Sequence, residues 1–162
     1  MKETLLKPRN LCASAIIAAL YTALTIALAP ISYGNIQCRL SEAMTLLPII
    51  MPSSIPGLFV GCLLSNLLAP IPSPIDIVFG SLTTLAAAIA TYQLRGKPVW
   101  AAMPPVLFNG IVVGAIVHSL YAPSVPLLLC MAEVAAGQAV AVFVLGFLLL
   151  TALKRIHIEK YL

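Results

Sequence analysis

Residues 36–48 read Ile-Gln-Cys-Arg-Leu-Ser-Glu-Ala-Met-Thr-Leu-Leu-Pro, and this stretch places charged and polar residues inside a sequence that is otherwise apolar. On a helix, Arg39 and Glu42 are three positions apart and share a face, where each can neutralise the other. Charges between long apolar segments are unfavourable and commonly mark a polar ligand, an ion path or a proton relay. We interpret the stretch as one wall of a binding site. The alternative is an ion pair at the water interface that fixes a helix end.

The composition is that of an integral membrane protein. Of the 162 residues, 61% are hydrophobic and 9% are charged, and the mean hydropathy is +1.06, whereas soluble domains carry about 25% charged residues. A helix needs about 20 residues to cross the hydrocarbon core, so the chain has room for five or six crossings and little else. The sequence contains no glycine-rich phosphate loop, so any energy from ATP has to come from a partner protein.

Proline- and glycine-rich turns divide the apolar sequence into segments. We expect one membrane domain, residues 1–162, with spans at about 11–29, 39–51, 55–69, 76–94, 99–120 and 127–153. The second and third segments are shorter than a full crossing, so one re-entrant hairpin is the alternative to two crossings.

The basic residues favour six crossings. Six crossings put both termini on one side of the membrane, and eight of the nine Lys and Arg residues then face the cytoplasm, with Arg39 as the exception. This placement explains the net charge of +4 without nucleic-acid binding. We therefore predict an all-α, six-transmembrane-helix bundle, with both termini cytoplasmic.

Polar side chains recur in the outer halves of the predicted helices, where an externally open pocket would lie. The embedded charges are one cation, Arg39, and three anions, Glu42, Asp76 and Glu133, an excess of two negative charges. Buried carboxylates need partners, so this excess suits a ligand with a cationic group or several N–H donors. Amides match a nucleobase-like edge on which donors and acceptors alternate. The predicted substrate-binding residues are Arg39, Glu42, Asn66, Asp76, Asn109, Glu133 and Gln138.

Asp76 also has a purely structural explanation, because it stands at a helix N-terminus after Pro74 and can cap that helix. The sequence shows no catalytic triad, metal-binding motif or redox pair of cysteines. We therefore expect no enzymatic activity, no metal and no cofactor.

The first apolar segment carries a strip of small residues. Ala15, Ala19 and Ala23 recur at every fourth position, so one face of this helix allows another helix to approach closely. The strip can pack against the protein's own helices or against a separate subunit.

Several short motifs resemble one known family, and the resemblance extends from about residue 11 to residue 150. The motifs are Arg39-Leu40-Ser41-Glu42-Ala43, Ile55-Pro56-Gly57-Leu58-Phe59, Gly61-Cys62-Leu63-Leu64 with Asn66-Leu67-Leu68, and Asp76-Ile77-Val78-Phe79-Gly80-Ser81-Leu82-Thr83-Thr84. They are similar to those of the QueT family, the queuosine-precursor S components of energy-coupling factor (ECF) transporters.

The resemblance implies a six-helix, multi-pass subunit of a prokaryotic cell membrane that captures a 7-deazaguanine, such as prequeuosine base or queuine, from outside the cell. It also implies docking on a transmembrane coupling subunit with two cytoplasmic ATPases, through small residues that match Ala15 and Ala19, and Ala23 extends this strip. The family leads us to expect Gly-Glu in the last helix, where this chain has Gly137-Gln138. Gln138 can hydrogen-bond a base but carries no charge.

The sequence is also compatible with three other functions. The chain could be an S component for another vitamin-like heterocycle, because sequence spacing does not give the shape of a pocket. It could be a solitary proton-coupled carrier in which Glu133 titrates. A membrane enzyme or assembly factor is the third, although the sequence offers no nucleophile with a base.

Overall fold

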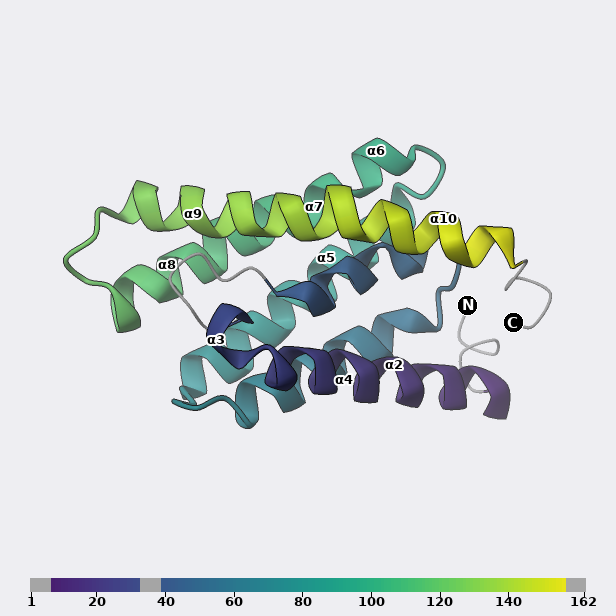
Figure 1. Ribbon diagram of the computed structural model, residues 1–162, viewed down its shortest axis with the longest axis horizontal. Helices are drawn as coiled ribbons and strands as arrows, with labels where there is room; N and C mark the ends of the chain where they lie inside the picture. Colours follow the sequence, from purple (N-terminus) through teal and green to yellow (C-terminus); the bar gives the residue numbers. More distant parts are fainter. Residues whose placement is uncertain (1–6, 33–38, 157–162) are drawn as a thin grey trace.

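The computed structural model describes residues 7–32 and 39–156, and all regular structure in those residues is helical. Helices occupy each of the six predicted segments (Figure 1). Their bounds are α2 Pro8–Ala27, α3 Ala29–Ser32, η1 Leu40–Ile49, α4 Ser54–Leu67, η2 Asp76–Gly80, α5 Ser81–Gln93, α6 Pro98–Ala101, α7 Met103–Phe108, η3 Asn109–Val113, α8 Gly114–Ile116, η4 Val117–Tyr121, α9 Leu127–Ala139, η5 Val140–Gly146 and α10 Phe147–Arg155. The segment η1 is a 3₁₀-helix, and η2, η3, η4 and η5 are π-helical turns.

Within the described ranges, three continuous helices are long and apolar enough to cross a membrane: Pro8–Ala27, Pro98–Tyr121 and Leu127–Arg155. Two of them begin with a proline, which lacks the backbone N–H that the first turn of a helix leaves unbonded. The helices Leu40–Ile49 and Ser54–Leu67 are apolar but shorter. The structure thus confirms a helical protein with membrane-type helices. The six crossings stay a prediction, as does the cytoplasmic location of the termini, which lie outside the described residues.

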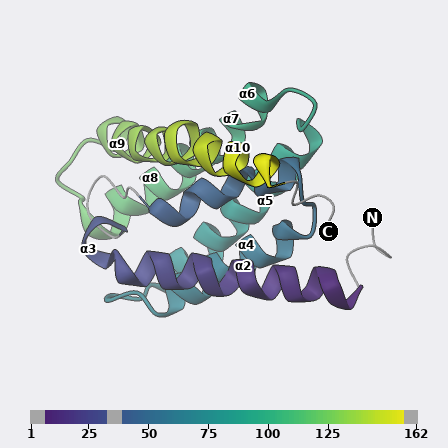
Figure 2. The same ribbon diagram turned by 45° about the vertical axis from the view of Figure 1, so that its right-hand side comes forward.

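The 3₁₀-helix η1 lies at the centre of the bundle. All of its residues from Ser41 to Pro48 are buried, and it packs against α2, α4, α5, η5 and α10. In Figures 1 and 2 it is the blue helix between α2 on one side and the α9–α10 helix on the other. The sequence predicted a span at 39–51; the structure shows a helix that the rest of the protein surrounds.

Glycines bring α2 and α4 into close contact. A Cβ atom at Gly57 would lie 2.5 Å from the backbone oxygen of Ser14, and one at Gly61 would lie 2.8 Å from Cβ of Tyr21. The two glycines are four residues apart and therefore lie on one face of α4, a common arrangement for close helix packing in membranes. This contact holds α2 against the wall of the bundle.

A second pair of glycines brings the fifth helical segment against α9. A Cβ atom at Gly110 would lie 2.9 Å from Cβ of Ala135, and one at Gly114 would lie 2.5 Å from Cα of Met131. The sequence analysis assigned no site role to these glycines, and the structure accounts for them by packing.

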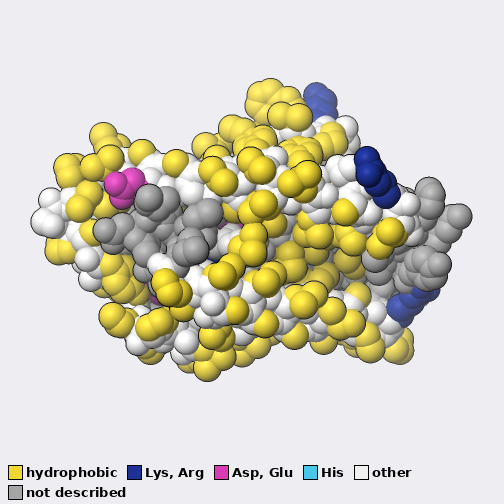
Figure 3. Space-filling view, viewed as in Figure 1, with side chains coloured by type: hydrophobic (Ala, Val, Ile, Leu, Met, Phe, Trp, Pro, Cys, Tyr) yellow, Lys and Arg dark blue, Asp and Glu magenta, His cyan; other side chains and the backbone are white. Residues whose placement is uncertain are grey.

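Exposed basic side chains gather at one end of the bundle. Figure 3 shows Lys and Arg side chains at the end where α2 begins and α10 ends in Figure 1, with mostly hydrophobic side chains over the rest of this face. The exposed basic residues in the described ranges are Lys7, Arg9, Arg95, Lys97, Lys154 and Arg155. Arg39, in contrast, is 7% exposed. It directly precedes η1 and donates to Ser32 at the end of α3, and α3 lies toward the other end of the bundle in Figure 1.

We predict that Gly57→Ala destabilises the protein, because the added methyl group would collide with backbone of α2. The free energy of unfolding should fall by about 1–3 kcal/mol, measured by thermal unfolding in detergent. Gly96→Ala is the matched control, since a Cβ atom there meets nothing within 4 Å. Equal melting temperatures for the two variants would contradict the close packing of α2 on α4.

Candidate binding site

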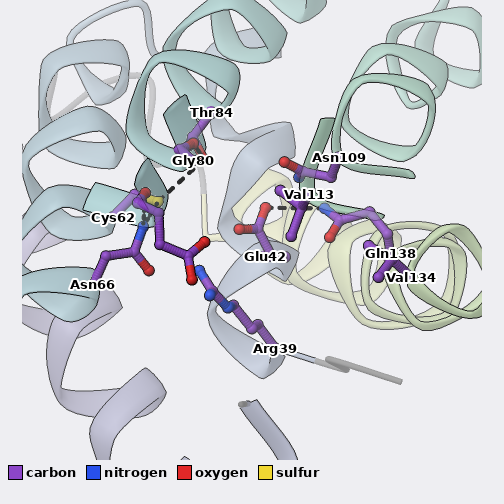
Figure 4. Close-up of a pocket in the computed structure, with 11 residues that line it drawn as sticks. Arg39, Glu42, Cys62, Asn66, Gly80, Thr84, Asn109, Val113, Val134 and Gln138 are labelled. Atoms are coloured by element: carbon purple, nitrogen blue, oxygen red, sulfur yellow. Dashed lines mark hydrogen bonds between the residues drawn. The ribbon is translucent and has the colours of Figure 1, made fainter. Parts of the chain in front are cut away.

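One pocket brings together six of the seven predicted substrate-binding residues. It lies inside the bundle, and the side chains come from η1, α4, η2, α5, η3 and α9 (Figure 4). The lining residues are Arg39, Glu42, Cys62, Asn66, Asp76, Gly80, Thr84, Asn109, Val113, Val134 and Gln138. Residues separated by almost a hundred positions in the sequence therefore meet at one polar site within an apolar protein.

Glu42 is the most deeply embedded charged group of the pocket. Its side chain is 2% exposed, and one carboxylate oxygen accepts a hydrogen bond from the hydroxyl of Tyr21. The other accepts a bond of 2.9 Å from Nε2 of Gln138. A carboxylate oxygen has two lone pairs, so each oxygen of Glu42 can accept one further hydrogen bond. The α2 and α9 helices thus hold this group in place without using all of its capacity.

Asp76 and Asn66 form a second wall of the pocket. Nδ2 of Asn66 donates to the backbone oxygen of Asp76 at 3.1 Å and to the sulfur of Cys62 at 3.6 Å. The hydroxyl of Tyr121 donates to Oδ2 of Asp76 at 2.7 Å. Asp76 lies within a helical run that begins before it, and its carboxylate accepts this side-chain bond. These contacts connect α4, η2 and η4 around the pocket.

Arg39 lies where the described chain enters η1. Its Nε donates to the backbone oxygen of Ser32 at 3.3 Å, and its own backbone oxygen accepts from the N–H of Glu42 at 3.0 Å. The Arg39 side chain lines the pocket and is therefore a positive group within reach of a bound molecule.

Asn109 contributes a carboxamide whose hydrogen bonds are still available. It begins the π-helical turn η3, lines the pocket and is 4% exposed. Among the described residues, its side chain has no hydrogen-bond partner. A π-helical turn adds a residue to the helix and is frequent at functional sites. Asp76 likewise begins a π-helical turn, η2.

The pocket is narrow. Its empty volume is about 320 Å³ when the open space at its entrance is included. The cavity between the lining side chains that can hold a molecule the size of water is only about 10 Å³. The second volume is about what a single water requires. A flat two-ring ligand therefore has to displace lining side chains when it binds, a change that is common in ligand recognition.

Glu133 is not among the pocket residues. Its side chain is half-buried, whereas Val134 and Gln138, four residues apart on α9, line the pocket. Successive residues of an α-helix are rotated by about 100°, so the residue before Val134 is turned away from the shared face. The lining charges are then one cation and two anions, Glu42 and Asp76, an excess of one negative charge instead of the expected two.

Two tyrosines complete the polar network and were missed in the sequence analysis. Tyr21 is fully buried and bonds Glu42, and Tyr121 bonds Asp76. A buried tyrosine hydroxyl usually has a hydrogen-bond partner, and this rule could have drawn attention to Tyr21 in the middle of an apolar helix. No comparable rule draws attention to the lining residues Cys62, Gly80 and Thr84 in the sequence.

The alanine strip of α2 faces away from the rest of the protein. Ala15, Ala19 and Ala23 are exposed, whereas Ile17 and Tyr21 on the opposite face meet the glycines of α4. Among the described residues, the exposure of the strip favours the second of the two alternatives, packing against a separate subunit, which stays a prediction.

We predict that Tyr21→Phe destabilises the protein, because it removes one donor from the buried carboxylate of Glu42. A hydrogen bond to a charged group contributes about 1.5–3 kcal/mol, so the melting temperature in detergent should fall clearly. Tyr92→Phe is the control, because the Tyr92 hydroxyl makes no hydrogen bond within the described ranges. A Tyr21→Phe variant as stable as the control would show that the bond to Glu42 contributes little.

Comparisons with known proteins identify the family. The family model described as QueT transporter matches residues 11–155. The queuosine precursor transporter QueT of Lactococcus lactis subsp. cremoris (strain MG1363) is 37% identical over 81 residues, which cover 49% of this chain and 47% of that protein. The match thus spans about half the length of the curated relative, and no solved structure matches the chain. Because the family model covers most of the sequence, this chain belongs to the QueT transporter family.

Proposed function

We propose that the protein is the substrate-binding S subunit of an ECF-type importer and captures a 7-deazaguanine, such as prequeuosine base or queuine, from outside the cell. The observation that carries the proposal is the convergence of Arg39, Glu42, Asn66, Asp76, Asn109 and Gln138 on one buried pocket. The name of the Lactococcus relative, a queuosine precursor transporter, supports the choice of substrate.

The donors and acceptors of the pocket suit a guanine-like heterocycle. Such a ring system has a lactam edge, where an N–H donor lies next to a carbonyl acceptor, together with an exocyclic amino group. The carboxamide of Asn109 offers a donor and an acceptor side by side and has no partner among the described residues. The carboxylate of Glu42 keeps acceptor capacity for N–H groups. The guanidinium of Arg39 can donate to the carbonyl oxygen.

The charge of the pocket favours a ligand with one positive charge. One cation and two anions line it, and a buried excess charge is unfavourable until an opposite charge neutralises it. A 7-deazaguanine with an aminomethyl substituent carries one ammonium group at neutral pH. A neutral heterocycle would leave the excess charge uncompensated, so we expect weaker binding of neutral analogues.

Gln138 replaces the glutamate that the family resemblance led us to expect. In this chain its amide donates to Glu42, which a carboxylate at the same position could not do. A glutamate there would place two carboxylates in contact and would raise the negative charge of the pocket. We therefore assign Gln138 the role of orienting Glu42, with its carbonyl oxygen available to the ligand.

The arrangement of charges supports the proposed topology in a multi-pass cell-membrane protein. The exposed basic residues lie at one end of the bundle (Figure 3), which the positive-inside rule assigns to the cytoplasm. Arg39 directly precedes η1 and bonds Ser32 of α3, and α3 lies toward the other end in Figure 1, so the pocket would open to the outside. Lys2 and Lys160, which also entered the topology prediction, lie outside the described residues.

The exposed alanines of α2 are the proposed docking surface for a transmembrane coupling subunit that works with two cytoplasmic ATPases. Small residues allow close helix approach in lipid, and Ala15, Ala19 and Ala23 are exposed in the described part of the chain, where α2 packs on α4 through its other face. A proton-coupled carrier that depends on Glu133 has less support, since Glu133 does not line the pocket.

We predict that Glu42→Gln folds but binds aminomethyl-7-deazaguanine weakly. The glutamine is isosteric and its oxygen can still accept from Tyr21, but it removes the negative charge and replaces one of the two accepting oxygens with an NH2 group, so affinity should fall by roughly 10- to 100-fold. Isothermal titration calorimetry on the purified protein measures the loss. Unchanged affinity would remove Glu42 from the binding site.

The same substitution at Glu133 is the matched comparison. We expect Glu133→Gln to bind within about twofold of the original protein, because its side chain is turned away from the pocket. A large loss of affinity in this variant would show that Glu133 reaches the ligand, as the sequence analysis predicted.

We predict that Ala19→Trp abolishes uptake in cells that supply the coupling module but leaves ligand binding intact. The large ring would prevent close approach of another helix to α2, and it projects away from the pocket. Ala86→Trp, at an exposed alanine of α5, is the control and should transport normally. Normal uptake by Ala19→Trp would exclude the alanine strip as the docking surface.

A further inference from the structure

The carboxamide of Asn66 has a hydrogen-bonded half and an unbonded half. The side chain is 2% exposed, and its Nδ2 group donates to the backbone oxygen of Asp76 at 3.1 Å and to the sulfur of Cys62 at 3.6 Å. Its Oδ1 atom is buried without a hydrogen-bond partner among the described residues. Buried acceptors of this kind are uncommon in folded proteins, and each needs an explanation.

The contacts of Nδ2 fix the orientation of the amide. If the side-chain amide were rotated by 180°, Oδ1 would face the carbonyl oxygen of Asp76, and two acceptors would be in contact. Gly80 leaves room for the observed orientation, because a Cβ atom there would lie 3.0 Å from Nδ2. The oxygen of Asn66 is therefore held as an acceptor and cannot exchange places with the nitrogen.

The position of this oxygen connects it with the pocket. Asn66 is a lining residue, and Figure 4 shows its oxygen turned away from Cys62, toward the side on which Arg39 lies. Glu42, by contrast, already receives hydrogen bonds from Tyr21 and Gln138. Of these two acceptors, Asn66 Oδ1 is the one without a donor in the part of the chain that the structure describes.

We propose that Asn66 is a specificity-determining residue whose Oδ1 accepts a hydrogen bond from an N–H group of the ligand. This inference rests on the proposed function and adds an orientation to it. Asn66 and Gln138, which bonds Glu42, lie on opposite sides of the pocket in Figure 4. A ligand that donates both to Asn66 and to the acceptors on the Gln138 side therefore has to present N–H donors on two opposite edges. A heterocycle with donors along one edge satisfies Glu42 and leaves Asn66 unbonded.

A double-mutant cycle between protein and ligand tests the inference. Calorimetry on the full chain compares aminomethyl-7-deazaguanine with three analogues, which lack the 2-amino group, lack the aminomethyl group or carry a methyl group on the pyrrole nitrogen. In the original protein, the analogue that lacks the N–H group bonded by Asn66 Oδ1 should bind roughly tenfold more weakly than the parent compound. In Asn66→Leu, which has no acceptor, the same analogue should bind as well as the parent compound.

The controls separate the possible outcomes. Asn66→Ala also removes Oδ1 and should give the same result as Asn66→Leu. Ser54→Ala changes another buried polar residue of α4, whose hydroxyl donates to the backbone oxygen of Met51. In this variant each analogue should bind more weakly than the parent compound by the same factor as in the original protein. If all three analogues lose the same affinity in both Asn66 variants as in the original protein, Asn66 accepts no hydrogen bond from the ligand and the inference is wrong. If the original protein binds none of the compounds, the proposed function fails and the inference fails with it.

Discussion

The structure depends on keeping the carboxylate of Glu42 in the interior of an apolar bundle. An isolated charge there would be strongly unfavourable, so the group has to be hydrogen-bonded. Tyr21 supplies one donor from α2, and Gln138 supplies the other from α9. Because Glu42 is on η1, this interaction joins the central helix to two outer helices (Figure 1).

The same constraint connects the fold to the proposed function. Glu42 keeps free lone pairs, Asn66 Oδ1 has no donor, and Asn109 has no side-chain partner in the described residues. Packing alone would favour apolar residues at these positions. Their unused hydrogen-bonding capacity is understandable if a donor-rich guest completes the pocket, and the narrow interior implies that the guest and the lining side chains adjust to each other.

Much of this arrangement could be predicted from the sequence. Apolar runs between proline turns predicted six segments, each of which contains helix in the structure, and isolated polar residues in those runs include six that line the pocket. That these segments are six crossings stays a prediction. Glu133 was included because a carboxylate without a local cation was taken to face the site. Its direction depends on the rotation of α9, which is set by contacts such as that of Met131 with Gly114. Those contacts join distant segments, so the sequence of α9 by itself does not reveal them.

The type of helix that several segments form also could not be predicted from the sequence. Nothing in Leu40–Ile49 specified a buried 3₁₀-helix instead of an α-helical span, because an apolar run fits both. The π-helical turns that begin at Asp76 and Asn109 depend on how neighbouring helices pack around them. Likewise, the exposure of Ala19 depends on the packing of Gly57 and Gly61 against the opposite face of α2, which the sequence of α2 alone does not reveal.

The central claim is that this pocket holds a donor-rich, guanine-like base. Mass spectrometry of the small molecules released from protein purified out of a membrane preparation tests it most directly. The account predicts a compound with the mass and fragmentation of a 7-deazaguanine that bears an amino group, in an amount proportional to the protein. Release of a different heterocycle in that proportion, after growth with the deazaguanine available, would contradict the account.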